Sequence, residues 1–167
     1  MGLRFKHAAI AFFVAILALV ISGCSSNPED VVKSGTLQID SSVTVGDALN
    51  GYQYFDDREW KSFEDPQKRQ IVEFNGAIDF DKFADTELEG MRLTSDMVKK
   101  AKEKLGDIAM TYEAQFAVSK DGKTFELKYS GIKMSGTNKN TGKKIDQDMA
   151  DDNFLMIQHV YANNILS

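Results

Sequence analysis

Three carboxylates precede the only tryptophan of the chain. Asp56, Asp57 and Glu59 all lie within the four residues before Trp60. Two carboxylates beside an aromatic platform are typical of a glycoside hydrolase, which needs them at a defined separation across a cleft. Residues adjacent in sequence need not converge in that way. We therefore favour an acid-rich turn, and an enzyme built on these acids remains the least favoured hypothesis.

A second acidic cluster lies near the C-terminus and consists of Asp146, Asp148, Asp151 and Asp152. Clustered carboxylates suit Ca²⁺, but this spacing lacks the glycine and the final glutamate of a helix-loop-helix calcium loop. Acidic residues at a helix N-terminus are a sufficient explanation, because they complement the helix dipole. We predict no metal here, and calcium binding stays open as the alternative.

His159 is the only histidine beyond residue 23, and four lysines lie between residues 99 and 104. One histidine without cysteine partners makes a poor transition-metal site, so we expect a surface or packing role. Lys99, Lys100, Lys102 and Lys104 could contact anionic lipid headgroups. The solvated face of an amphipathic helix is the interpretation that we favour for them.

Cys24 is the only cysteine of the chain and follows an N-terminal apolar stretch. Residues 8–21 are uninterrupted apolar, and Arg4 and Lys6 stand before them. A helix that spans a bilayer needs about 20 apolar residues, whereas the length of this stretch fits the hydrophobic region of a signal peptide. We therefore expect the segment to be cleaved, with a retained N-terminal anchor as the alternative.

The residues around Cys24 resemble the lipobox of bacterial lipoproteins. Ile21 is followed by two small residues, Ser22 and Gly23, and then by the cysteine. The resemblance implies a signal peptide over residues 1–23, a diacylglyceryl group on the thiol and an acyl chain, such as palmitate, on the freed amine. Two or three long chains make membrane attachment effectively permanent.

The residue after the cysteine bears on location. It is Ser25 rather than aspartate, and the resemblance associates aspartate at this place with retention in the inner membrane. The expected location is therefore the outer membrane, facing the periplasm, in a double-membrane bacterium. In a single-membrane organism it is the outer face of the plasma membrane.

Composition limits what the rest of the chain can be. The signal segment holds two basic and no acidic residues, so the mature chain has 18 Lys+Arg against 25 Asp+Glu and a net charge of −7. This acidity, without a basic stripe, argues against nucleic acid as a partner. Because Cys24 would be lipidated, neither cysteine catalysis nor a disulfide is available to the folded part. We expect residues 24–35 to form the lipidated start and a flexible tether, and residues 36–167 to form a single domain.

The first half of that domain predicts alternating helices and strands. We expect a short strand at 36–39, a helix at 44–51 capped by Thr44 and ended by a left-handed Gly51, and strands at 59–64 and 70–80. In the last of these, Val72, Phe74, Ile78 and Phe80 alternate with Glu73, Asn75 and Asp79, which indicates a sheet with one buried face.

The second half predicts a helix, a hairpin and a final helix. The spacing predicts a helix from Leu93 to Gly106, capped by Thr94 or Ser95, with Met97, Val98, Ala101 and Leu105 on its apolar face. Asp121-Gly122 favours a type I′ turn, which would place Val118 opposite Phe125, Phe116 opposite Leu127 and Ala114 opposite Tyr129. Asp146 or Asp148 would then cap a helix that continues to about Ile165.

Several short motifs resemble a small domain of uncharacterised bacterial lipoproteins and other exported proteins. They are residues 44–49 with Tyr52, residues 60–63, residues 71–74, residues 125–127 with Tyr129, and residues 160–163. The resemblance covers most of the mature chain. It supports the fold and export, and it implies no catalytic residue.

The predicted fold class is α+β, with an antiparallel sheet of two hairpins, about four to five strands, and helices packed mainly on one face. No nucleophile elbow, phosphate loop or metalloprotease motif occurs in the sequence. We therefore expect a non-catalytic lipoprotein domain that needs no cofactor and binds another cell-envelope component, protein or otherwise. The alternative is a small-ligand carrier or sensor with a cleft between the sheet and the helices.

Overall fold

The computed structural model describes residues 27–88, 90–139 and 141–166. Their order is α1 (Pro28–Ser34), β1 (Thr36–Leu37), β2 (Asp40–Thr44), α2 (Val45–Gly51), β3 (Phe55–Glu64), β4 (Gln70–Ile78), the 3₁₀ helix η1 (Phe80–Phe83), β5 (Glu87–Leu88), β6 (Met91–Arg92), α3 (Ser95–Leu105), β7 (Ala109–Val118), β8 (Phe125–Thr137), β9 (Lys144–Ala150) and α4 (Leu155–Tyr161). The predicted α+β class is confirmed.

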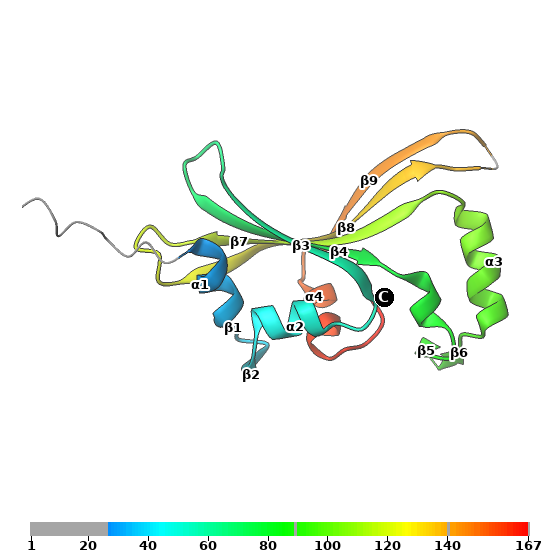
Figure 1. Ribbon diagram of the computed structural model, residues 1–167, viewed down its shortest axis with the longest axis horizontal. Helices are drawn as coiled ribbons and strands as arrows, with labels where there is room; N and C mark the ends of the chain where they lie inside the picture. The colour runs from blue at the N-terminus through cyan, green and yellow to red at the C-terminus, as the bar shows by residue number, and fades with distance from the viewer. Residues whose placement is uncertain (1–26, 89, 140, 167) are drawn as a thin grey trace, which may run out of the picture.

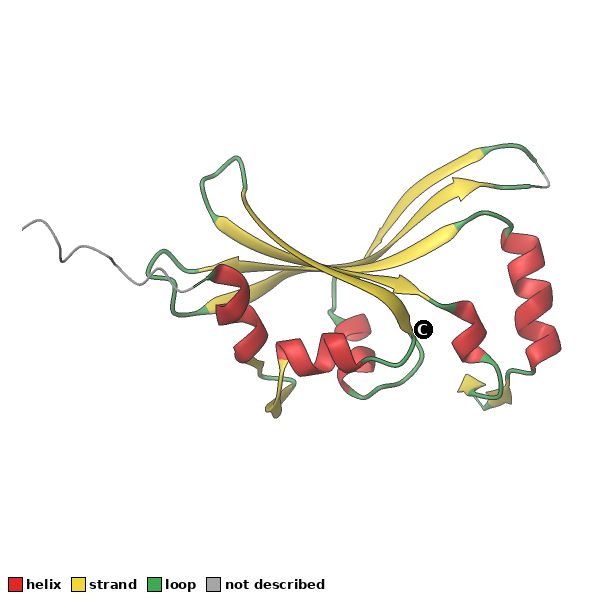
Figure 2. Cartoon of the chain, in the orientation of Figure 1, coloured by secondary structure: helices red, strands yellow, loops and turns green. Residues whose placement is uncertain are grey.

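One antiparallel sheet organises the domain. Its strand order is β3-β4-β7-β8-β9, so each strand pairs with its neighbour along the chain within this sheet. Helices α1, α2 and α4 lie against one face, whereas the opposite face is bare in Figures 1 and 2. The alternation predicted for β4 is present, because Val72 and Phe74 are fully buried under these helices.

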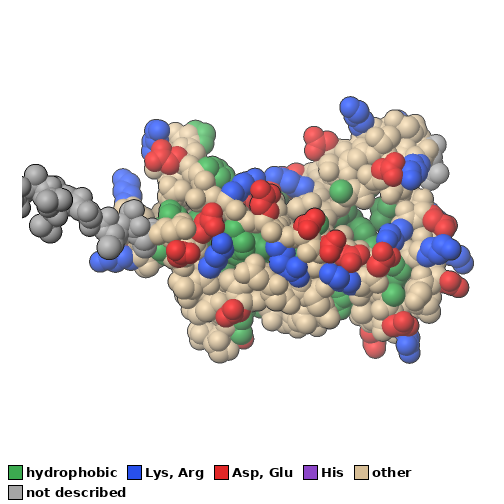
Figure 3. Space-filling model, in the orientation of Figure 1, with side chains coloured by type: hydrophobic (Ala, Val, Ile, Leu, Met, Phe, Trp, Pro, Cys, Tyr) green, Lys and Arg blue, Asp and Glu red, His purple; other side chains and the backbone are tan. Residues whose placement is uncertain are grey.

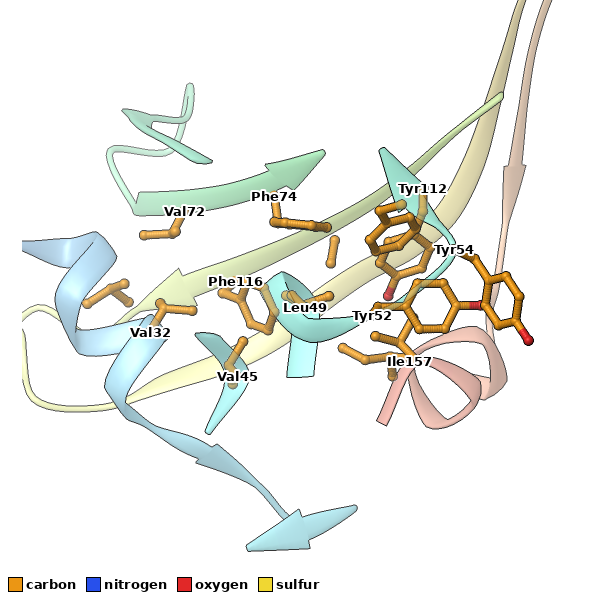
Figure 4. Close-up of a cluster of buried hydrophobic side chains, with 14 of the residues drawn as sticks. Val32, Val45, Leu49, Tyr52, Tyr54, Val72, Phe74, Tyr112, Phe116 and Ile157 are labelled. Atoms are coloured by element: carbon orange, nitrogen blue, oxygen red, sulfur yellow. The ribbon is translucent and has the colours of Figure 1, made fainter. Parts of the chain in front are cut away.

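The core lies between the helices and this face of the sheet. Val32 of α1, Leu49 of α2 and Ile157 of α4 are fully buried there, and Figure 4 shows them gathered around the aromatic side chains of the sheet. Phe55 packs on Tyr112 with ring centroids 5.6 Å apart, and its ring also fills the space beside Gly76. The three helices are therefore held by apolar burial, the largest favourable term in folding.

The predicted flexible tether is wrong from Pro28 onward, where α1 begins. The Asn27 side chain caps this helix by accepting from the Glu29 amide, and proline is suited to the first helical position. Val32 anchors it in the core. The folded domain therefore begins near residue 28 rather than at 36, and residues 1–26, with the predicted signal peptide and Cys24, lie outside the described residues.

The two helices predicted in the middle of the chain are confirmed. Thr44 caps α2 and Thr94 caps α3, each by accepting from the amide three residues later. Gly106 ends α3, as predicted, with a φ of +70° that glycine adopts without strain. Gly51 has no positive φ and is the last residue of α2, so the predicted left-handed stop is wrong.

The β7–β8 hairpin was predicted correctly only near its turn. Phe116 pairs with Leu127 as expected, but a bulge between Gln115 and Phe116 shifts the remaining pairs, so that Ala114 lies opposite Ser130. The turn is not type I′, because Gly122 has a φ of +66° whereas Asp121 has no positive φ. The Gly122 amide donates to the Ser119 carbonyl and closes the turn.

Residues 144–150 form the strand β9, not the start of the predicted final helix. Ile145 and Met149 alternate with acidic residues, as an edge strand allows. Helix α4 starts only at Leu155, and Asp151 rather than Asp146 or Asp148 binds its first turn, by accepting from the Met156 amide at 2.6 Å. The predicted strand 70–80 likewise ends early, at Ile78, and Phe80 belongs to η1.

A long excursion separates the paired strands β4 and β7. It contains η1, β5, β6 and α3, and it lies at the opposite end of the long axis from α1 (Figure 1). Tyr54 and Phe83 join its base to the core through an edge-to-face contact at 5.3 Å. Val98 is the only buried residue of α3, so the predicted apolar face of this helix is mostly solvated. No helix within the described ranges is long and apolar enough to cross a membrane.

Candidate functional site

The bare face of the sheet carries an ordered group of polar side chains. It comprises Lys61 of β3, Glu73 and Asn75 of β4, Glu113 and Gln115 of β7, Tyr129 and Lys133 of β8, and Asp148 of β9. We call this group the polar face. Successive side chains of a strand point to opposite sides, so each of these residues lies opposite the core residues beside it. No helix of the described chain covers the polar face in Figure 2.

Glu73 is the most densely bonded residue of the polar face. One of its oxygens, Oε1, lies 2.7 Å from the Lys61 ammonium and accepts from Asn75 at 2.8 Å. The other, Oε2, accepts from Gln115 at 2.9 Å. The carboxylate is only 5% exposed. An ionised group can be buried in this way only where several donors replace its hydration.

Gln115 joins Glu73 to a second buried carboxylate. The same amide nitrogen that bonds Glu73 also donates to Glu113 Oε1 at 2.7 Å. Glu113 is 2% exposed, and its other oxygen forms an ion pair with Lys133. Two buried acids are thus bridged by one amide and flanked by two half-exposed lysines.

The pKa values of Glu73, Lys61 and Lys133 are shifted in favour of their charged forms. Burial alone would raise the pKa of Glu73, but the hydrogen bonds from Lys61, Asn75 and Gln115 outweigh it and lower that pKa. The same bond from Glu73 raises the pKa of Lys61, and Glu113 raises the pKa of Lys133. Glu73 is therefore held ionised, and Lys61 and Lys133 are held protonated. A general acid or base differs from them, because its pKa should lie near the working pH.

Tyr129 closes the polar face toward β9. Its hydroxyl donates to Asp148, and its ring lies over Gly131. A Cβ atom at position 131 would lie 2.4 Å from that hydroxyl oxygen and 2.7 Å from the Met149 carbonyl. Partial burial, together with the Asp148 carboxylate, raises the pKa of Tyr129. A glycine on β8 thus makes room for the aromatic ring.

The polar face is an open saddle rather than a pocket. The β3–β4 and β8–β9 hairpins both rise above the centre of the sheet in Figure 1, so the face is concave between them. Figure 3 shows basic and acidic side chains intermixed along this part of the surface. Such a surface can form hydrogen bonds and ion pairs with a partner, and its pre-ordered side chains would lose little entropy on binding.

Two hollows lie beside α4, on the side of the molecule opposite the polar face (Figure 1). One, of about 400 Å³, is lined by Ile39, Asp40, Gln158, His159, Tyr161, Ala162 and Asn164. The other, of about 300 Å³, adjoins the base of the excursion and shares His159 and Asn164 with the first. Burial and the nearby Asp40 raise the pKa of Tyr161 to about 12. Both hollows are open to solvent and are lined by polar as well as apolar side chains.

Most residues singled out in the sequence do not form a site. Asp56, Asp57 and Glu59 are exposed on β3, and Trp60 turns to the other face, where its ring packs on Phe74 at 4.9 Å. These carboxylates do not enclose a cleft with the tryptophan, as a glycoside hydrolase would require.

The C-terminal acidic cluster is divided between two elements. Asp148 bonds Tyr129 and Asp151 binds the first turn of α4. Within the described ranges, no three His, Cys, Asp or Glu side chains are arranged to hold a metal ion. His159 is half-buried on α4, as expected of a packing histidine.

Three of the four α3 lysines singled out in the sequence are exposed without an ion pair among the described residues. Lys99, Lys100 and Lys104 are exposed on α3, and Lys102 forms an ion pair with Asp81 of η1 at 2.5 Å. This arrangement agrees with the interpretation as a solvated helix face. Cys24, the one residue to which the sequence assigns a modification, lies outside the described residues.

Sequence reasoning placed two residues of the polar face correctly and missed the others. The alternation on β4 placed Glu73 and Asn75 opposite the core, but it did not identify Glu113, Gln115 or Lys133 as their neighbours. The available signal was a pair of polar residues, Glu113 and Gln115, at alternate positions in an otherwise apolar strand.

Comparison with known proteins yields no relative: no family model, no curated protein and no solved structure matches the chain. The resemblances to the lipobox and to domains of exported lipoproteins therefore remain predictions from the residues.

Proposed function

We propose that this chain is a lipoprotein of the bacterial envelope, anchored through lipid on Cys24, and that its domain is a non-catalytic module that binds another envelope protein. The proposal has two parts. The sequence before residue 25 supports the anchor, and the geometry of the domain supports the binding role.

The short distance between Cys24 and the fold determines where an anchored domain would lie. Only three peptide units separate the Cα atom of Cys24 from that of Asn27, which caps α1. Three units reach at most about 11 Å. Because α1 is packed on the core, a lipid on Cys24 would hold the whole domain close to the membrane surface.

The open polar face is the single observation that supports the binding role best. Five strands about 4.8 Å apart and about 30 Å long present a face of roughly 600 Å², which is close to the 800 Å² or so that each partner contributes to a standard interface. Its buried acids hold Lys61 and Lys133 in place before any partner arrives. Fixed charges on a broad face suit protein recognition better than proton transfer.

Photo-crosslinking in intact cells tests this function. A photoreactive amino acid at Thr111, which lies on the bare face beside Lys133 on the neighbouring strand, should yield a discrete crosslink to an envelope protein. The same group at Lys100 of α3, which is exposed but not part of the polar face, is the matched control and should yield none.

A second variant makes the result specific. Lys133→Glu reverses one half-exposed charge of the polar face and should abolish the Thr111 crosslink. The proposal is wrong if Thr111 gives no crosslink, or if it gives the same products as Lys100.

The second candidate is a small-ligand carrier, supported by the two hollows that meet at His159. Native mass spectrometry of the protein taken from its membrane would then show a bound small molecule. That mass would disappear in Gln158→Trp, because the larger side chain would fill the first hollow. Finding the protein without added mass would exclude this candidate for the material tested.

A further inference from the structure

One end of the domain must face the membrane if Cys24 carries lipid. Helix α1 lies at this end, with the start of the described chain (Figure 1). The turn between β7 and β8 lies beside it: Phe125, just after the turn, contacts Gly35 so closely that a Cβ on Gly35 would lie 2.2 Å from the ring. The excursion with α3 occupies the other end of the long axis.

The β7–β8 turn carries two lysines toward solvent. Lys120 and Lys123 are exposed and flank Asp121-Gly122. Within the described ranges, neither ammonium group forms a salt bridge. The Asp121 carboxylate is engaged locally, because it accepts from the Ser119 hydroxyl at 2.6 Å and from the Lys123 amide at 3.1 Å.

The other basic groups near this end are paired. Lys33 of α1 pairs with Glu29, and Lys68 and Arg69 of the β3–β4 turn pair with Glu64 and Asp65. Lys128 pairs with Glu126. Besides Asp121, Asp30 of α1 and Asp47 of α2 are acidic residues outside those pairs. Lys120 and Lys123 are therefore the cations available to an outside partner, and Figure 3 shows basic side chains on both sides of the start of the described chain.

We propose that the β7–β8 turn rests on the membrane to which Cys24 is anchored, with Lys120 and Lys123 on the phosphates of anionic lipid headgroups. This inference depends on the anchor in the proposed function. The three-unit reach from Cys24 to Asn27 keeps the turn near the headgroups, and each lysine near an anionic surface strengthens the contact by about fivefold. The domain would then stand with α3 pointing away from the bilayer.

Lysine acetylation of the full lipidated chain tests the orientation. The protein is placed in vesicles of phosphatidylcholine, in vesicles that also contain phosphatidylglycerol, and in neutral detergent, and the rate at each lysine is read by mass spectrometry. We expect acetylation of Lys120 and Lys123 to slow several-fold in the anionic vesicles relative to detergent. Lys99 and Lys100, which are also exposed but lie on α3, are the internal controls, and each should react at the same rate in all three environments.

Three results would overturn the inference. Equal rates at Lys120 in all three environments would exclude contact with the membrane. Equal protection in both kinds of vesicle would exclude the electrostatic contact with anionic headgroups. Protection of Lys99 and Lys100 instead would reverse the orientation. The same spectra report whether Cys24 carries lipid, so failure of the anchor is recognised separately from failure of this contact.

Discussion

At the scale of single residues, the polar face shows how charges are buried on an open sheet. Glu73 and Glu113 lie under their neighbours although no helix of the described chain covers them. Removing a carboxylate from water is costly, and hydrogen bonds and ion pairs to the neighbouring side chains offset that cost. The side-chain amide of Gln115 donates to both Glu73 and Glu113. The network should therefore be sensitive to loss of any donor.

Lys61→Met should destabilise the domain by about 1–3 kcal/mol, because it leaves the buried Glu73 carboxylate with fewer donors. The Lys61 side chain is 49% exposed, so water can replace part of the lost bond. Lys68→Met is the matched control on the same hairpin. Its partner Glu64 is exposed, and such a surface pair contributes about 0–1 kcal/mol. Urea midpoints measure both, and equal small losses would show that the network contributes little.

Glu73 should also make the domain sensitive to acid. Its folded pKa lies below the ordinary value, so its contribution is present above the unfolded pKa of about 4.3 and is lost as the pH falls through the folded pKa. In Glu73→Gln this part of the pH dependence should be missing. Urea unfolding at pH 7, 5 and 3 should thus show a smaller loss of stability on acidification in the variant. Parallel curves for the two proteins would contradict the assignment.

At the scale of elements, helices with complete local signals were predictable from sequence. Thr94 and Gly106 mark both ends of α3, and Thr44 marks the start of α2. Helix α1 was missed because seven residues carry little helical preference of their own. It is held by Val32 in the core, a tertiary contact that the local sequence does not reveal.

Errors in the sheet have a related cause. The bulge at Gln115 depends on pairing between strands, so the sequence of one strand does not show it. Strand β9 was interpreted as the start of a helix because its aspartates suit a helix N-terminus equally well. The polar face was incomplete for the same reason: alternation shows which way Glu73 points, but only the register shows that Gln115 lies opposite it.

Helix α2 offers a direct test of packing against α1. A Cβ atom at Gly46 would lie 2.8 Å from the Lys33 carbonyl, whereas nothing lies within 4 Å of one at Gly51. Gly46→Ala should therefore destabilise the domain by about 1–3 kcal/mol, as overpacking does. Gly51→Ala should stabilise it by about 0.5 kcal/mol through helix propensity. Thermal midpoints that move in the same direction would show that α1 does not pack on α2 as described.

At the scale of the whole molecule, the fold places its parts along one axis. Helix α1 and the β7–β8 turn lie at one end, the excursion with α3 lies at the other, and the polar face lies between them (Figure 1). With an anchor at Cys24, the end that carries α1 would face the membrane and the end that carries α3 would point away from it. The polar face would then be exposed to partners beside the membrane. Both proposals therefore depend on what happens to residues 1–24.

Mass spectrometry of the N-terminal peptide, taken from full-length protein extracted from bacterial membranes, tests most directly whether the chain is cleaved before Cys24 and whether Cys24 is lipidated. We expect a mature chain that begins at Cys24, with a diacylglyceryl group on its sulfur, and an unprocessed precursor without lipid in Cys24→Ala. A mature peptide that retains residues before Cys24, or an unmodified Cys24 thiol, would contradict it.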